Sequence, residues 1–202
     1  MAVTFDTSDA RNVGGGTTVS FSYTVTGSNT LLFTGVTQAV TSITYNGAAL
    51  SSIGTSGSLN VFSKTGPSTG SNTLSFSFSS YSGSHYAVTG SFAGVDQTTP
   101  LGTVVTNSGS SSAPSTGSIT CPASGAIYGQ FFHNYSTATP TVTSGIAAGL
   151  ITSFTQTYGG AYDTSTKALS WSVNKSGSWW TVGVPINQVS AGADVLLGQA
   201  CL

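Results

Sequence analysis

Apolar and polar residues alternate along much of this chain. In 17–25, 73–80 and 168–173, apolar residues stand at every second position, and most residues between them are Ser or Thr. The apolar sets are Val19, Phe21, Tyr23 and Val25, then Leu74, Phe76 and Phe78, then Leu169, Trp171 and Val173. A period of two is that of a β-strand, and helical periodicity is nearly absent. The pattern predicts antiparallel sheets with one packed face and one solvated face.

Further strands are predicted between clusters of Gly, Asn, Ser and Pro. They cover 30–35, 40–45, 48–53, 58–64, 85–93, 102–106, 117–121, 125–132, 139–143, 150–157 and 179–186. Asn46-Gly47 predicts a tight hairpin, because both central positions of a type I′ turn need a positive φ. Many short strands at regular spacing predict an all-β fold, an antiparallel two-sheet β-sandwich of the jelly-roll type. The residues expected to be mostly buried are Phe21, Tyr23, Phe76, Phe78, Trp171 and Trp180.

Two segments bear on the domain organisation. Segment 106–118, "TNSGSSSAPSTGS", could divide two small sandwiches or form a long crossover within one. Strand patterns resume on both sides and neither half looks complete alone, so we predict one domain over 1–189. The tail 190–202 breaks the alternation and is expected to be irregular or to form a short helix. Because terminal arms often order only by docking, Val195, Leu196 and Leu197 are expected to be buried against a partner.

The chain is poor in charge. Charged residues make up 4% of its 202 residues, and Ser and Thr supply about a third; ordinary soluble domains have roughly 25% charged residues. The four basic residues form no stripe, so nucleic acid is not an expected partner. No apolar run approaches the ~20 residues of a membrane-spanning helix, so no membrane partner is expected. Such a surface offers little repulsion between copies, which favours a protein that packs among other copies or one that is inert.

Carboxylates are too few and too scattered to predict catalysis. The acids are all Asp: Asp6, Asp9, Asp96, Asp163 and Asp194. Glycoside hydrolysis generally needs two carboxylates facing each other across the sugar, and no pair here lies on an alternating polar face. The close pair in "FDTSDARN" could hold a weak Ca²⁺, but a turn or helix cap is the expected interpretation. We expect no catalytic residue and no cofactor.

Histidines and cysteines give no metal motif either. His85 and His133 lack the close ligand neighbours that zinc needs, so both are interpreted as structural. Cys121 and Cys201 could form one disulfide bridge, although two reduced thiols are the favoured interpretation. No metal site is predicted.

Aromatic residues near the C-terminal end leave two interpretations open. In "GSWWTVGVPI", Trp180 alternates with Val and Ile as a core face, which directs Trp179 the other way. Trp179 is therefore predicted to cover a sheet edge or to contact a neighbouring subunit. If Trp179, Tyr158 and Tyr162 shared one exposed face, they would instead suit a stacked sugar.

The stretch "SFAGVDQTTPLG", residues 91–102, predicts a strand end, a turn and the next strand. Asp96 can satisfy turn amides with its side chain, and Pro100 fixes its own φ. The longer string "SFAGVDQTTPLGTVV" resembles a signature of a domain found in tailed-phage virion proteins and bacterial surface proteins. The same order of features runs from "TFDTSDARNVGGGTTVSFSYTV" to "WWTVGVPI", over about residues 2–188. The resemblance implies a jelly-roll or concanavalin-like β-sandwich with a structural or adhesive role, and it implies no catalytic residue.

These observations favour a virion structural protein that is not an enzyme. The start "MAVTFDTSD" shows no signal peptide, so we expect a chain made in the host cytoplasm that leaves the cell on a virus particle. The specific expectation is a phage capsid decoration protein that contacts the major capsid protein, or another virion protein, and copies of itself. A trimer is expected first and a dimer second. The alternative is a carbohydrate-binding or adhesive module on a phage fibre, filament or cell surface, with a glycan as ligand.

Overall fold

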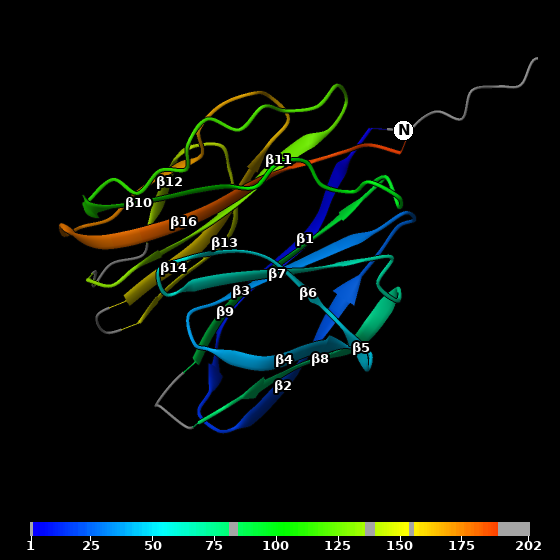
Figure 1. Ribbon diagram of the computed structural model, residues 1–202, viewed down its shortest axis with the longest axis horizontal. Coiled ribbons are helices and arrows are strands. Elements are labelled where there is room, and N and C mark those ends of the chain that lie inside the picture. Colours follow the sequence, from blue (N-terminus) through cyan, green and yellow to red (C-terminus); the bar gives the residue numbers. More distant parts are fainter. Residues whose placement is uncertain (1, 81–84, 136–139, 154–155, 190–202) are drawn as a thin grey trace, which may run out of the picture.

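The computed structural model describes residues 2–80, 85–135, 140–153 and 156–189. Over these ranges the secondary structure consists of β-strands in antiparallel pairs, and three large sheets stack on one another (Figure 1). Within the same ranges, no helix has the length and apolar character needed to cross a membrane.

The central sheet is buried on both faces. Its strands, in spatial order, are β1 (Thr4–Gly14), β9 (His85–Ala93), β3 (Leu31–Val36), β7 (Leu59–Thr65) and β6 (Ser51–Ser56). Every residue of β3 is buried, as is every residue of β9 except the last. Their sequences, "LLFTGV" and "HYAVTGSFA", contain no Asp, Glu, Lys or Arg, which suits strands with no solvated face.

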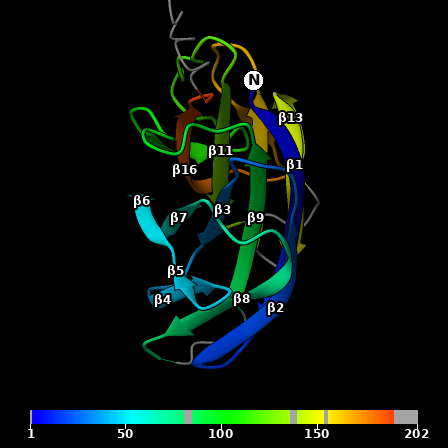
Figure 2. The same cartoon turned by 90° about the vertical axis from the view of Figure 1, so that its right-hand side faces the viewer.

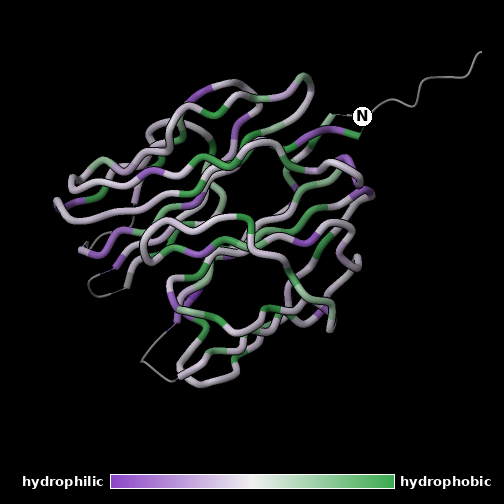
Figure 3. Tube along the Cα trace, in the orientation of Figure 1, coloured by the Kyte–Doolittle hydropathy of each residue, from purple (hydrophilic) through white to green (hydrophobic). Residues whose placement is uncertain are grey.

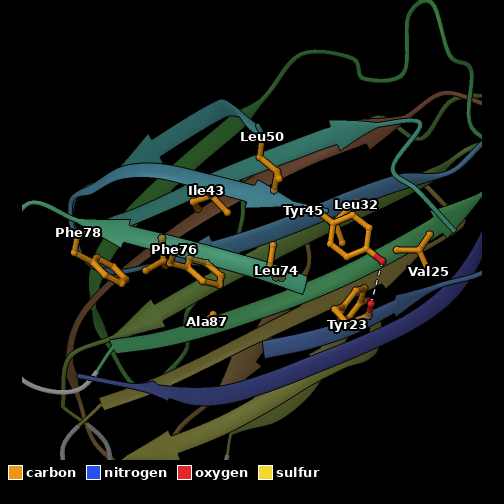
Figure 4. Packing of buried hydrophobic residues seen from close by; sticks show 11 residues of the cluster. Tyr23, Val25, Leu32, Ile43, Tyr45, Leu50, Leu74, Phe76, Phe78 and Ala87 are labelled. Atoms are coloured by element: carbon orange, nitrogen blue, oxygen red, sulfur yellow. Dashed lines mark hydrogen bonds between the residues drawn. The ribbon is translucent and has the colours of Figure 1, made fainter. Parts of the chain in front are cut away.

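A four-stranded sheet covers one face of the central sheet. It consists of β2 (Thr18–Val25), β8 (Gly70–Phe78), β4 (Val40–Tyr45) and β5 (Ala48–Ala49), in that order. Alternate residues of β2, β8 and β4 point inward and form a core with Leu32, Val36 and Ala87 of the central sheet (Figure 4). Within this core the Tyr45 hydroxyl donates a hydrogen bond to the Tyr23 carbonyl at 3.0 Å.

A five-stranded C-terminal sheet covers the other face of the central sheet. Its order is β10 (Val105–Ser111), β16 (Gly177–Ile186), β11 (Ala126–His133), β14 (Gln156–Asp163) and β13 (Ile146–Ser153). Phe33 and Phe92 of the central sheet pack on Tyr128 of β11 in the layer between these two sheets. The outer face of the C-terminal sheet packs on Leu169 and on Trp171. Trp171 belongs to a two-stranded sheet of β12 (Thr141–Ser144) and β15 (Ser170–Ser172).

The predicted all-β antiparallel sandwich is confirmed, and the stack is deeper than the two sheets expected. Of the six residues predicted to be mostly buried, Tyr23, Phe76, Phe78 and Trp171 are buried, whereas Phe21 and Trp180 are half-buried. The Asn46-Gly47 hairpin is also confirmed, with φ of 49° and 75° at its two central residues. The third sheet was not foreseen, because local periodicity identifies strands but does not show which strands share a sheet.

Four local predictions are wrong. The predicted strand 150–157 instead covers the end of β13 and the start of β14, which are two separate strands. The segment around Asp6 and Asp9 is neither a turn nor a helix cap but lies within β1, an edge strand paired with β9. The first part of segment 106–118 is neither of the two alternatives considered, a linker or a long crossover, since Val105–Ser111 forms β10 and pairs with β16. Residues 117–121 form no strand and make only an isolated bridge at Ile119. The tail 190–202, with Val195, Leu196 and Leu197, lies outside the described residues.

Candidate functional site

The turn after β9 is held by the carboxylate of Asp96. One carboxylate oxygen accepts the backbone N–H groups of Thr98 at 2.7 Å and Thr99 at 2.8 Å. The adjacent Gln97 amide donates to the carbonyls of Val95 at 2.9 Å and Thr30 at 3.3 Å. The predicted role of Asp96 as a turn residue is therefore confirmed.

The same turn joins the central sheet to the C-terminal sheet. The Asp96 amide donates to the Asn187 carbonyl, and the Asn187 amide donates to the Pro100 carbonyl, both at 2.9 Å. Leu101 forms a bridge with Ile186 at the end of β16. The stretch "GVDQTTPLG" thus connects two layers through its backbone.

Asp6 lies at an irregularity of β1 and binds two neighbouring strands. Its carboxylate accepts hydrogen bonds from the Ser91 hydroxyl at 2.7 Å and from the Thr26 amide at 2.8 Å, and the Thr26 hydroxyl also contacts it. The buried Tyr23 hydroxyl extends this network, since it donates to the Thr7 carbonyl at 2.8 Å and lies 3.2 Å from the Ser91 hydroxyl. Burial raises the pKa of Tyr23 far above its ordinary value, so this hydroxyl remains a donor.

Asp9 and Asp163 each form an ion pair within the chain. Asp9 pairs with Arg11, whose guanidinium carbon lies 4.2 Å from the centre of the Phe21 ring. Asp163 pairs with Lys167 at 2.8 Å. Partial burial opposes ionisation of Asp163, but bonds from Lys167 and Ser165 outweigh it and lower the pKa of this carboxyl. These carboxylates therefore hold the chain's own strands and loops.

The two histidines occupy different environments. The Nδ1 atom of His133 accepts the Tyr135 amide at 3.1 Å, so Nε2 carries the proton and donates to the Ser111 carbonyl at 3.1 Å. Burial lowers the pKa of His133, which favours this neutral form. His85 is fully buried and stacks on Phe78 at a ring distance of 3.7 Å. Neither ring nitrogen of His85 has a hydrogen-bond partner among the described residues.

The described part of the chain brings together no group of three or more His, Cys, Asp or Glu side chains able to hold a metal ion. Cys121 is half-buried, and burial raises the pKa of its thiol. Cys201, the other half of the disulfide bridge considered for Cys121, lies outside the described residues.

The three aromatic residues considered as a sugar platform do not share an exposed face. Trp179 is 7% exposed, and its indole N–H donates to the Ser111 hydroxyl at 2.9 Å. Its ring covers Gly109 of the edge strand β10, where an added Cβ would lie only 2.6 Å from the ring. Of the two roles predicted for Trp179, the structure places it over a sheet edge, which leaves little of the ring for a partner.

Tyr158 and Tyr162 lie in two different cores. Tyr158 is 2% exposed and stacks between Tyr86 and Phe132, with ring distances of 4.9 and 5.0 Å. Trp180 extends this stack on the far side of Phe132. Tyr162 is half-buried and stacks on Phe5 at 4.3 Å. The aromatic rings therefore fasten the C-terminal sheet to the central sheet.

The outer face of the four-stranded sheet is an array of hydroxyl groups, which we call the hydroxyl face. Its residues come from β2, β8 and β4, whose alternate residues are apolar and point into the core. The register aligns them in rows: Thr18, Ser77 and Ser42; Ser20, Ser75 and Thr44; Ser22 and Thr73; Thr24 and Ser71. Neighbouring strands lie ~4.8 Å apart, so the rows form a close array without a charged side chain. In Figure 3 the strands of this sheet alternate between green apolar positions and pale positions, which are those of Ser and Thr.

The Ser alternation that produces this face is visible in the sequence, but no functional role was predicted for it. The hydroxyl face could have been predicted from the Ser/Thr alternation that 17–25 and 73–80 share, since these two segments pair in register. The neighbouring contribution of β4 could not be found in this way, because the order of strands in a sheet is not visible in the chain.

Comparison of the chain with protein-family models, with curated proteins and with solved structures found no significant match. The resemblance to a domain of tailed-phage virion proteins therefore stays a prediction.

Proposed function

We propose that this protein is a non-enzymatic structural subunit of a virus particle, and specifically a capsid decoration protein of a tailed phage. The observation that carries the proposal is the hydroxyl face: a broad, uncharged surface on a rigid sandwich. Such a surface can pack against other protein without the cost of burying unpaired charge.

The chemistry of the remaining polar residues supports the same conclusion. Asp6, Asp9 and Asp163 bind groups of the chain itself, and so does His133. Asp96 caps a turn. Residues used in this way hold a fold together and are not poised to react with a substrate.

The order of the strands supports the jelly-roll interpretation. Strands β1, β3, β7 and β9 lie in the central sheet, and β2, β4, β5 and β8 lie in the four-stranded sheet. In each sheet the first strand lies beside the last, β1 beside β9 and β2 beside β8. We infer that β1–β9 fold as two interleaved Greek keys, as jelly rolls of capsid and lectin domains do.

Decoration would act mechanically and through many weak contacts. Each copy would bridge neighbouring shell subunits, and repetition over the shell would offset a modest affinity per copy. The tail 190–202 stays a predicted docking arm, with Val195, Leu196 and Leu197 as its apolar contacts.

The experiment is to delete the gene from the phage that carries it and to compare particle stability. We expect normal assembly but DNA release at a lower temperature, restored when purified protein is added back. Protein lacking 190–202 should restore less if the tail is the anchor. Full stability without the gene, together with absence of the protein from immunogold-labelled particles, would contradict the proposal. Binding of the purified protein to a glycan array would instead support the adhesive alternative.

A further inference from the structure

β2 is an edge strand, although β1 packs beside part of it and Arg11 of β1 covers one face of its Phe21 ring. It pairs with β8 on one side, and no strand of the described residues pairs with its other side; Figure 2 shows it at the margin of its sheet. Its eight residues, "TVSFSYTV", pair with β8 without a register shift and contain no charged residue and no proline. Natural edge strands are commonly blunted by Lys, Pro, bulges or short length, because an open edge can pair with another chain.

The other sheet edges are covered, short or capped. β1 and β13, edges of two different sheets, lie against each other. β5 has two residues. In β10 the Asn107 side chain accepts the Ser108 amide at 2.9 Å, and the Asn107 carbonyl accepts the Ser56 hydroxyl at 3.0 Å. β6 packs at that same margin.

The hydrogen-bond alternation of β2 identifies which groups face outward. The Phe78 amide donates to the Thr17 carbonyl, while Thr18 lies opposite Ser77. In an antiparallel pair, hydrogen-bonded and non-hydrogen-bonded positions alternate. Odd-numbered residues of β2 therefore bond to β8. The N–H and C=O groups at the open edge are those of Thr18, Ser20, Ser22 and Thr24.

We infer that β2 pairs antiparallel with β2 of a second copy of this chain, about a two-fold axis at Phe21. Thr18 then faces Thr24 of the other copy and Ser20 faces Ser22, so the open backbone groups of both edges satisfy one another. Ser and Thr side chains meet Ser and Thr across the junction, which is a favourable cross-strand pairing without like charges. A second copy fits this edge because, in the register centred on Phe21, each of the four residues with outward N–H and C=O groups meets another of the four.

Phe21 lies at the centre of this junction, beside the ion pair of Arg11 and Asp9. Its ring is half-buried at the margin of the core, stacks on Phe76 at 5.9 Å and lies under Arg11. In the inferred register, Phe21 is the non-hydrogen-bonded position opposite its own copy, where side chains approach most closely. The two rings would shield each other from water, as central aromatic residues of interfaces do.

The pairing deepens the proposed role of this protein as a repeated subunit and names the surface by which two copies join. An antiparallel strand pair has two-fold symmetry, so it gives a dimer and leaves no open β2 edge for further addition. Both hydroxyl faces would continue across the junction as one surface.

The experiment measures association of the isolated full chain by sedimentation equilibrium at concentrations up to about 1 mM. A junction of two eight-residue strands is smaller than the ~1,200 Å² of standard interfaces, so we expect a weak dimer. Ser20→Lys places a charge on the open edge, and we expect dimer affinity to fall at least ~10-fold. The matched control is Ser75→Lys, on the same face and in register with Ser20 but one strand inward, which should dimerise like the unchanged chain.

Two further measurements keep the inference testable if one variant folds poorly. Ser22→Pro removes only an outward N–H, so it should remain folded by circular dichroism and lose the dimer. Amide exchange of the unchanged chain should show Thr18, Ser20, Ser22 and Thr24 protected at high concentration and exposed on dilution. A monomer at 1 mM, or a dimer in which these amides stay exposed or which Ser20→Lys leaves intact, overturns the inference. Because no particle is involved, these results stand apart from the gene-deletion test.

Discussion

At the scale of single residues, the polar side chains of this protein serve the fold. Asp96 is the clearest case, because two turn amides converge on one of its oxygens. The same principle applies to Asp6, which joins β1, β9 and the residue after β2. An acid in an exposed loop suggests chemistry when only the sequence is seen, but a turn must also satisfy its own amides, and Asp does this well.

Replacing Asp96 by Ala should destabilise the protein by about 1 kcal/mol, the scale of a lost side-chain hydrogen bond. Urea denaturation gives the free energy of unfolding. Asp96→Asn is the matched control, since it keeps an acceptor oxygen and should lose less. Equal losses in the two variants would mean that the negative charge matters and would reopen the question of a bound cation.

The stability of the protein should fall on the acid side of neutrality because of His133. Burial lowers the pKa of this imidazole in the folded state below the ordinary value of 6.5, whereas the unfolded chain takes up its proton near 6.5. The stabilisation is therefore complete above about pH 6.5 and is lost as the pH falls toward the folded-state pKa. Protonation would also remove the acceptor that Nδ1 offers to the Tyr135 amide.

The measurement is the urea midpoint between pH 7.5 and 5.5, compared with His133→Asn. The Asn variant retains an acceptor but does not titrate, so its midpoint should change less over this interval. The lowered pKa of Asp163 acts only below its ordinary value of 3.8 and so does not interfere. Parallel pH profiles of the two proteins would exclude His133 as the cause.

At the scale of elements, alternation predicted those strands that have one wet face. β2 and β8 follow the predicted boundaries closely, and the Asn46-Gly47 turn was readable from its residue types. β1 escaped prediction because its sequence, "TFDTSDARNVG", carries short polar and charged residues on both faces. It is a strand because β9 pairs with it along its length, and pairing with a distant segment leaves no local signal.

The candidate site was less predictable than the strands. The alternation in β16 correctly predicted that Trp179 points away from the side occupied by its core residues. Its burial over Gly109, however, depends on β10, and no strand was predicted at Gly109. The open edge of β2 is likewise a property of sheet order. Local periodicity indicates which face of a strand is buried, but not which neighbour it has.

The central and C-terminal sheets approach each other closely where the Gln130 side chain of β11 meets Gly35 of β3. The Gln130 amide donates to the Val88 carbonyl at 2.9 Å and to the Tyr128 hydroxyl at 2.7 Å, and its oxygen lies over Gly35. A Cβ at Gly35 would fall 1.6 Å from that oxygen. Gly35→Ala should therefore destabilise the protein by roughly 1–3 kcal/mol, the scale of an overpacked core.

A double-mutant cycle with Gln130→Ala isolates this contact. Truncating Gln130 alone leaves the Val88 carbonyl without its side-chain donor but makes room at Gly35. The double variant should thus be more stable than the sum of the two single losses predicts. Strict additivity would mean that the two residues do not touch.

At the scale of the whole molecule, the central sheet is shared by two cores. One face packs on the four-stranded sheet and the other on the C-terminal sheet, through β3 and β9 that are buried throughout. A layer with two buried faces cannot keep its structure when either cover is lost, since its apolar side chains would be exposed to water. This arrangement favours the single domain predicted for 1–189 over two independent sandwiches.

Cooperativity between the layers can be measured because all three tryptophans lie on the C-terminal side. Trp171 belongs to β15, and Trp179 and Trp180 to β16. Phe76, fully buried, lies in the opposite core under the four-stranded sheet.

Phe76→Ala should lower the free energy of unfolding by about 3–5 kcal/mol, and the tryptophan fluorescence transition should move with the circular dichroism transition. Ser75→Ala, on the solvated face of the same strand, should leave both within about 0.5 kcal/mol. If Phe76→Ala shifted only part of the circular dichroism signal and left the tryptophan transition in place, the four-stranded layer would unfold by itself and the chain would be two domains.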